Sequence, residues 1–232
     1  MLNSFGVFAA ATCLSIGIMA PCIADSNASA HLKEKLPKTV VLQNAISGAE
    51  SSRRETSSGD MTADAIRETA GTEIALVPSE EISDAFLSGG VVKLSAFNTI
   101  LRYSGDSGDT IATMNLTGSQ ILKLCERSVS RFPLAYDGFL QVSGMEIRFN
   151  SVLPRGARVT QIKIDGNDIK PDTEYSVATT HAMAAGAYGY FSILKNTQVT
   201  NLSDDTLAAA LNQYLRTHAV IDGSLGTRVT AQ

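Results

Sequence analysis

Residues 178–190 read ATTHAMAAGAYGY and overlap the end of a run, Thr173–Thr179, that is rich in β-branched and aromatic residues. Such a run predicts a β-strand. Gly186 and Gly189 follow among alanines, and glycines beyond a strand predict a tight turn in backbone conformations that other residues rarely adopt. The stretch therefore predicts a strand that ends in a close-packed glycine turn.

Four further segments accompany this stretch in a definite order. They are RETSSGDMTADAIR at 54–67, TGSQILKLCERS at 117–128, GFLQVSGM at 138–145 and GTRV at 226–229. All five resemble signatures of the C-terminal domain of secreted 5′-nucleotidases and UDP-sugar hydrolases, and five motifs in order are far more specific than one. The resemblance runs from about residue 53 to 229. It implies an α/β fold (α+β mixed), a layered domain with mixed β-sheets.

The pattern of the residues agrees with a mixed α/β layout. We expect a helix from Ser58 or Asp60 through Ala70, a strand at Glu73–Val77, a capping box of Thr117 and Gln120, and a last amphipathic helix after Ser203 or Asp204. Asp165-Gly166 predicts a hairpin turn between the strand Thr160–Ile164 and the strand Thr173–Thr179.

Composition favours one compact exported domain. The 232 residues are 44% hydrophobic and 18% charged, enough to bury a sizeable core without disulfides. A formal net charge of −4, with no basic cluster, argues against a nucleic-acid partner. Cys125 is expected to be the one thiol of the folded domain, and its helical neighbours Ile121, Leu122 and Val129 indicate a packed core cysteine.

The amino terminus has the pattern of an export signal. Residues 7–20 are apolar but too short to span a bilayer, and small residues follow, so we expect a signal peptide at 1–24, with Ala30 as a second cleavage position. Cys22 is a weaker candidate for lipidation because Pro21 precedes it. We expect a linker at 25–52, the domain at 53–232, and a periplasmic or secreted protein without a membrane span.

Hydrolytic chemistry is not expected of this chain alone. The resemblance implies that full-length relatives hydrolyse phosphate esters in a separate metallophosphatase domain, for which 232 residues leave no room. The three histidines His31, His181 and His218 lack metal-ligand spacing, so we expect no catalytic residue, metal or cofactor. Gly105–Asp109 reads GDSGD, but the only histidine before this serine, His31, lies in the expected linker, so a surface turn is a better interpretation than a serine triad.

The resemblance implies a ligand pocket in which several of the residues that contact the ligand in the family are replaced. Phe139 matches a phenylalanine that stacks on the base, although burial between sheets is an equal interpretation. The second aromatic position is Ala182, and Tyr188 replaces an aspartate, either as a new ring platform or, slightly favoured, as a plug.

The phosphate-binding positions of the family are altered as well. Its glycines fall at Ser79, Glu80 and Glu81 and its arginine at Ser83, and carboxylates repel a phosphate that an arginine would bind. Asp109 lies near the asparagine position of another turn. Arg54 lies near a second phosphate arginine, with a solvated side chain as the alternative.

These observations favour a domain that is not an enzyme by itself and that binds a small, nucleoside-like or other aromatic ligand in a remodelled pocket, with Phe139, Tyr188, Arg54 and Asp109 as candidate residues. One alternative is a specificity subunit that acts with a separate metallophosphatase. Another is a protein-interaction module with a filled pocket, since fold alone does not define function.

Overall fold

The computed structural model describes residues 38–105 and 108–232, and Pro37–Gln232 form a compact unit. The expected signal peptide and Cys22 lie outside the described residues. Strands β1 (Thr39–Leu42) and β2 (Ile46–Ser47) fall within the range 25–52 that was expected to be a linker. Val40, Leu42 and Ile46 are buried in the core. The folded unit therefore starts well before Arg53, because Val40, Leu42 and Ile46 supply part of the core.

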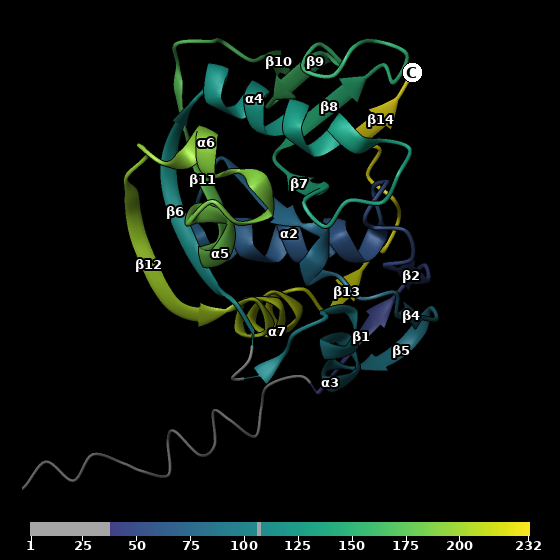
Figure 1. Ribbon diagram of the computed structural model, residues 1–232. Coiled ribbons are helices and arrows are strands. Elements are labelled where there is room, and N and C mark those ends of the chain that lie inside the picture. Colours follow the sequence, from purple (N-terminus) through teal and green to yellow (C-terminus); the bar gives the residue numbers. More distant parts are fainter. Residues whose placement is uncertain (1–37, 106–107) are drawn as a thin grey trace, which may run out of the picture. The chain divides into compact units, whose positions relative to one another are not determined.

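A five-stranded mixed sheet forms the centre of the unit, in the order β12-β6-β11-β3-β7 (Figure 1). Its strands are β3 (Ile74–Pro78), β6 (Thr110–Thr117), β7 (Leu140–Ser143), β11 (Glu174–Thr180) and β12 (Val199–Thr206). The pair β11 and β3 is parallel, and the other neighbours are antiparallel. This mixed sheet confirms the expected fold class.

Strand β3 shows why the sheet is covered on both faces. Its residues alternate between two hydrophobic clusters, with Ala75 and Val77 in one and Ile74 and Leu76 in the other. All five of its residues are buried. A strand buried on both faces reads as a continuous apolar run rather than an alternating one, which is the pattern IALVP.

Helices α2 (Ser57–Ala70) and α7 (Leu207–Thr217) pack together over one face of this sheet. Both helices were expected, but their N-caps are Thr56 and Thr206, whose hydroxyls accept the backbone N–H of Gly59 and Ala209. Asp60 lies in the first turn of α2 instead of capping it. Threonine caps satisfy orphan N–H groups as aspartate or serine would.

On the other face lie helix α4 (Gly118–Ser128) and a four-stranded sheet in the order β10-β9-β8-β14. These strands are β8 (Met145–Phe149), β9 (Val159–Ile164), β10 (Asn167–Asp168) and β14 (Val229–Ala231). The capping box of Thr117 and Gln120 starts α4 as expected. Cys125 is buried and free, and burial raises the pKa of its thiol.

The expected hairpin turn forms, but with a different partner strand. Asp165 and Gly166 have positive φ values and connect β9 to the short β10. Strand β11 instead pairs with β6 and β3 in the central sheet. The residue types Asp165 and Gly166 determine the turn locally. The pairing of β11, in contrast, depends on the burial of its apolar residues between the two hydrophobic clusters.

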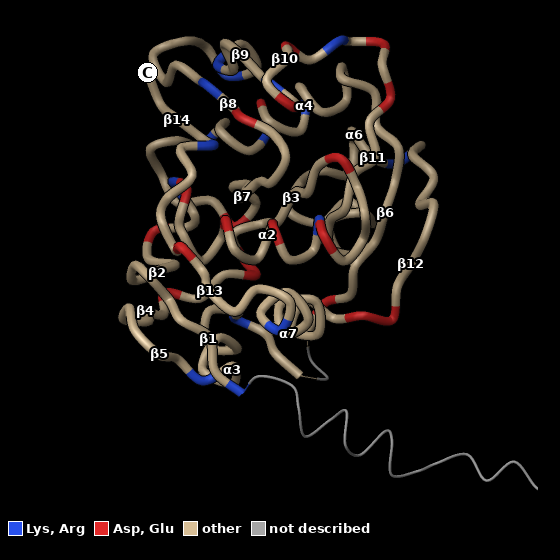
Figure 2. Tube along the Cα trace, turned by 180° about the vertical axis from the view of Figure 1, so that it is seen from behind, with Lys and Arg blue, Asp and Glu red and all other residues tan. Residues whose placement is uncertain are grey.

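Short elements complete the unit. They are β4 (Phe86–Leu87), β5 (Gly90–Lys93), β13 (Val220–Ile221), α3 (Leu94–Phe97), α5 (His181–Ala184), α6 (Phe191–Leu194) and the 3₁₀ turns at Ser79–Glu81, Asn98–Ile100, Val129–Arg131 and Ala187–Gly189. Strands β13, β1 and β5 form one small sheet, and β2 pairs with β4. Acidic and basic positions are interspersed along the described chain (Figure 2).

Candidate functional site

Several residues that the sequence singled out lie along one edge of the central sheet, the one formed by the carboxyl ends of β3 and β11. Strands β3 and β11 are parallel, so Glu81 just beyond β3 and the glycine turn beyond β11 lie at the same edge. Strands β6 and β7 run the other way, so Asp109 and Phe139, which precede them, belong to this edge as well. Ligand sites of mixed and parallel sheets form at such carboxyl ends. We refer to Glu80, Glu81, Asp109 and Tyr188 as the acidic mouth.

Asp109 is fully engaged as a structural acceptor. Its Oδ2 accepts the backbone N–H of Ala182 at 2.9 Å, and its Oδ1 accepts the backbone N–H of Thr110 at 2.9 Å. The first of these bonds ties the start of β6 to the short helix α5 that opens the glycine turn. An aspartate at this position therefore stabilises the turn, and its charge faces the neighbouring Glu81.

Tyr188 and Glu81 meet at the centre of the acidic mouth. The Tyr188 hydroxyl donates to Glu81 Oε1 at 3.4 Å, and the tyrosine side chain packs against the second hydrophobic cluster. Burial, and then the negative charge of Asp109, raise the pKa of Glu81 to about 7. Burial, and then Glu81, also raise the pKa of Tyr188. The Tyr188 side chain therefore lies half-buried between Glu81 and the second hydrophobic cluster.

Glu80 is held at the rim of the acidic mouth. Its Oε1 accepts the hydroxyl of Tyr103 at 2.7 Å, while its backbone carbonyl accepts Arg102 Nε at 2.8 Å. The Arg102 guanidinium also donates to the carbonyl of Ile82 at 3.3 Å. Arg102 thus stabilises the turn that carries the two glutamates by hydrogen bonds to its carbonyls. These contacts were not apparent from the sequence, because Arg102 lies outside every recognised motif.

Phe139 lies in the core. The side chain is 2% exposed and belongs to the second hydrophobic cluster. Of the two interpretations of Phe139, burial between sheets describes its position. A ring with so little exposed surface has no free face for a flat ligand, because stacking requires one.

Arg54 and Ser83 do not contribute free phosphate-binding groups. Arg54 forms an ion pair with Glu50, four residues earlier, and its side chain is 65% exposed. The Ser83 hydroxyl donates to the carbonyl of Thr99. The structure thus brings Asp109 and Tyr188 together with Glu81, while Arg54 remains a solvated surface residue.

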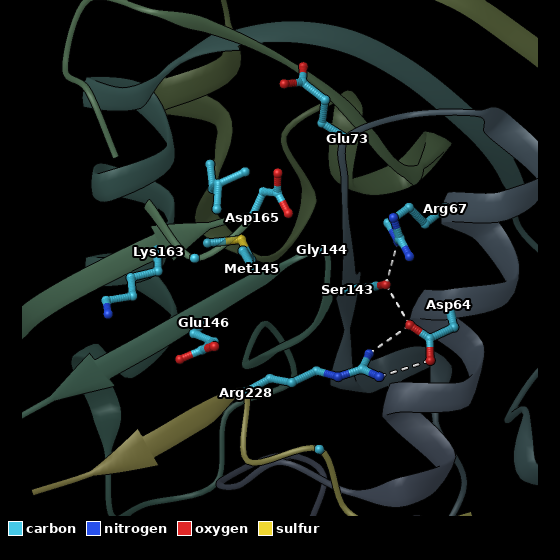
Figure 3. A pocket seen from close by; sticks show the side chains of 13 residues that line it. Asp64, Arg67, Glu73, Ser143, Gly144, Met145, Glu146, Lys163, Asp165 and Arg228 are labelled. Carbon is cyan, nitrogen blue, oxygen red and sulfur yellow. Dashed lines mark hydrogen bonds and ion pairs between the residues drawn. The ribbon is translucent and has the colours of Figure 1, made fainter. Parts of the chain in front are cut away.

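A second polar site lies where the helix α2 motif meets the C-terminal turn. Arg228 donates two hydrogen bonds to Asp64, from Nη1 to Oδ1 and from Nη2 to Oδ2, each 2.8 Å long (Figure 3). Ser143 donates to Asp64 Oδ1, and Arg67 Nε donates to Ser143 Oγ at 2.7 Å. The motifs at 54–67, 138–145 and 226–229 therefore converge on one network, which sequence spacing alone does not reveal.

This network borders a hollow of about 610 Å³, which we call the polar hollow. Lys163 and Glu73 line it together with Asp64, Arg67 and Arg228, so that charges of both signs surround the space (Figure 3). Its size falls in the range typical of small-molecule sites, although its lining is more polar than most.

Two buried carboxyls sit behind the network. Asp60 Oδ2 accepts the backbone N–H of Gly226 at 2.9 Å, and Glu55 Oε2 accepts the backbone N–H of Val229 at 2.7 Å. Burial raises the pKa of Asp60 to about 8, Arg228 opposes the shift, and Glu55 adds to it. The carboxyls of the family-like motifs therefore attach the chain end to α2.

Within residues 38–105 and 108–232, no group of three or more histidine, cysteine, aspartate or glutamate side chains is placed to hold a metal ion. His31 lies outside the described residues. No helix in the described ranges is long and apolar enough to cross a membrane.

Two covered faces around a mixed central sheet place the protein in the layered α/β class. The family described as "5′-nucleotidase, C-terminal domain" matches residues 30–196, and the chain belongs to that family. This match confirms the resemblance.

Two relatives match this chain over a part of their own length. The trifunctional nucleotide phosphoesterase protein YfkN of Bacillus subtilis is 30% identical over 146 residues, covering 59% of this chain and 10% of that protein. A 5′-nucleotidase of Diplobatis ommata is 25% identical over 61% of this chain and 25% of that protein. The chain thus spans a quarter or less of these relatives.

Solved structures agree with the fold. A 5′-nucleotidase precursor from Thermus thermophilus superposes with a TM-score of 0.73 and 25% identity, over 88% of this chain and 41% of that one. A 5′-nucleotidase from Staphylococcus aureus gives a TM-score of 0.67 at 13% identity, over 94% of this chain and 45% of that one, which supports the fold alone.

Proposed function

We propose that this protein is an exported, non-catalytic binding module of the 5′-nucleotidase C-terminal domain family. Its inherited ring-and-phosphate pocket is filled by its own side chains, and it binds a small polar ligand in the polar hollow. The observation that carries this proposal is the contact of Tyr188 with Glu81 beside Asp109. Carboxylates at a phosphate position add repulsion and desolvation cost.

The ligand chemistry follows from the polar hollow. Arg67 and Lys163 offer positive charge, while Glu73 and Asp165 offer negative charge around the same space. A small molecule that carries both a carboxylate and an ammonium group would pair with both sets, and charge-assisted hydrogen bonds are the stronger ones. A nucleoside ring would instead need an aromatic face, which the buried Phe139 does not offer.

A thermal-shift measurement tests this proposal. Adenosine is expected to leave the melting temperature unchanged, whereas one or more zwitterionic compounds should raise it. Lys163→Gln should reduce that rise, and Lys195→Gln, at an exposed lysine elsewhere, should not. A rise with adenosine that Phe139→Leu abolishes, or a zwitterion response that survives Lys163→Gln, would contradict the proposal.

A specificity subunit that acts with a separate metallophosphatase is the second candidate. It is favoured by the extent of the structural match, 88% of this chain against 41% of the Thermus thermophilus protein. Co-expression of this chain with a lone metallophosphatase domain from the same genome, followed by pull-down, tests it. A stable complex that hydrolyses AMP faster than the metallophosphatase alone would support this candidate, and failure to associate would reject it.

Export is a separate part of the proposal. The expected signal at 1–24 motivates it. N-terminal sequencing of protein from the extracytoplasmic fraction should give a chain that starts after Ala24 or Ala30. A full-length chain confined to the cytoplasm would contradict export.

A further inference from the structure

Three arginines line a second hollow, whose lining residues differ from those of the acidic mouth and the polar hollow. Its volume is about 550 Å³, and it is lined by Glu126, Arg127, Ser130, Arg131, Arg155 and Gly156. Arg127 is on α4, Arg131 ends the 3₁₀ turn that follows it, and Arg155 lies in the loop before β9. We refer to this space as the arginine hollow.

Other residues already satisfy the local negative groups. Arg158 Nη1 donates to the carbonyls of Val129, Ser130 and Phe132 at 2.8–3.2 Å, which belong to the 3₁₀ turn after α4 and to the residue that follows it. Both oxygens of Glu126 are taken by backbone N–H groups, of Arg158 at 3.1 Å and of Val159 at 2.7 Å. These three carbonyls and this carboxylate therefore do not need the three arginines of the hollow.

The pairing of the three arginines supports an anion site. Among the described residues, none of them forms an ion pair with an aspartate or glutamate. In the same part of the chain, Arg127 Nε is buried and has no hydrogen-bond partner. Guanidinium groups without a carboxylate partner are suited to an anion that supplies acceptors.

Arg127 is held in place by its surroundings. Its Cζ lies 4.9 Å from the ring centroid of Tyr136, and that of Arg131 lies 5.9 Å from the same centroid. A Cβ at Gly189 would lie 2.2 Å from Arg127 Nη2, and Gly189 has a φ of +78°. The glycine turn therefore leaves room for the guanidinium, and the Tyr136 face orients it.

We infer that the arginine hollow binds a compact oxyanion, a phosphoryl group that is either free or at the end of a small molecule. The side chains of three arginines line this space together with one carboxylate whose oxygens are already bonded. Guanidinium groups match the oxygens of phosphate bidentately. The site is distinct from the acidic mouth, where carboxylates occupy the inherited phosphate position.

Calorimetric titration at constant ionic strength tests this inference on the whole mature protein. Inorganic phosphate and glycerol 3-phosphate are the two probes, with chloride as the background anion. Saturable binding of either probe is expected, and tighter binding of the ester would identify a phosphorylated small molecule as the ligand. Binding of neither probe would overturn the inference.

Variants locate the binding. Arg131→Gln and Arg155→Gln, both at exposed residues, should each weaken binding roughly tenfold, the effect of losing one charge-assisted contact. Arg216→Gln, at an exposed arginine of α7, is the matched control and should have no effect. Arg127→Lys keeps the charge but loses the planar fork, and should also weaken binding. Affinity that is unchanged in Arg131→Gln and Arg155→Gln would overturn the site.

Phosphate binding in the arginine hollow can be tested independently of ligand binding in the polar hollow. Lys163→Gln alters the polar hollow and should leave phosphate binding unchanged. Loss of phosphate binding in Lys163→Gln, with normal binding in Arg131→Gln, would move the anion to the polar hollow and refute the assignment.

Discussion

Glu81→Gln is expected to make the protein more stable than the wild type at pH 8 while having little effect at pH 4. Glu81 is buried beside Asp109, and these surroundings raise its pKa from 4.5 to about 7. The folded protein therefore binds more protons than the unfolded chain between these values. Its free energy of unfolding must then fall as the pH rises through this interval.

The magnitude follows from the two pKa values. The difference between 4.5 and about 7 corresponds to roughly 3 kcal/mol. Glutamine fills a similar volume, keeps an oxygen that accepts the Tyr188 hydroxyl, and never ionises. The variant should therefore gain roughly 2–3 kcal/mol over the wild type between pH 4 and pH 8.

Urea unfolding of both proteins at several pH values measures this gain directly. Glu174→Gln, at the exposed start of β11, is the matched control and should follow the wild type at every pH. Asp60 also has a raised pKa, but it is present in all three proteins, so its contribution cancels in the comparison. An advantage of Glu81→Gln that does not grow with pH would refute the described environment of Glu81.

Three further substitutions probe the packing. Phe139→Ala should lower the free energy of unfolding by about 3–5 kcal/mol, because it leaves a cavity in the core; a loss under about 1 kcal/mol in urea would mean that the ring is not buried. Gly186→Ala should cost about 1–3 kcal/mol, since its φ is +92° and a Cβ would lie 2.6 Å from the Cα of Phe191; an unchanged melting temperature would contradict the turn geometry. Arg228→Met should cost about 1.5–3 kcal/mol by removing the two charge-assisted hydrogen bonds to Asp64, and equal stability in urea at pH 7 would show that the pair is not formed.

Local sequence signals were sufficient for much of the framework. The capping box of Thr117 and Gln120 and the turn at Asp165-Gly166 each depend on neighbouring residues, and both form. The prediction that the strand Thr173–Thr179 follows this turn was wrong. Strand pairing is decided by burial across the sheet, which local patterns do not encode. Thr56 was missed as a cap because Ser58 and Asp60, two and four residues later, are equally good capping types.

For the candidate sites, the sequence could identify residues but not their contacts. The residues of the acidic mouth could be identified, since Tyr188 stands in the stretch 178–190, and the resemblance places Glu81 at a phosphate-loop position and Asp109 near the asparagine of another turn. Their protonation and contacts could not, because these depend on burial. The pair of Asp64 and Arg228 joins residues 164 positions apart, and no local pattern predicts such a contact.

Phosphate release from AMP by the purified protein, with magnesium, manganese or zinc supplied in turn, tests the central claim most directly. The proposed non-catalytic role, with carboxylates at the positions where the family resemblance places phosphate-binding groups, predicts no metal-dependent release above a buffer control. Turnover that requires the metal and follows the protein through every purification step would contradict the account.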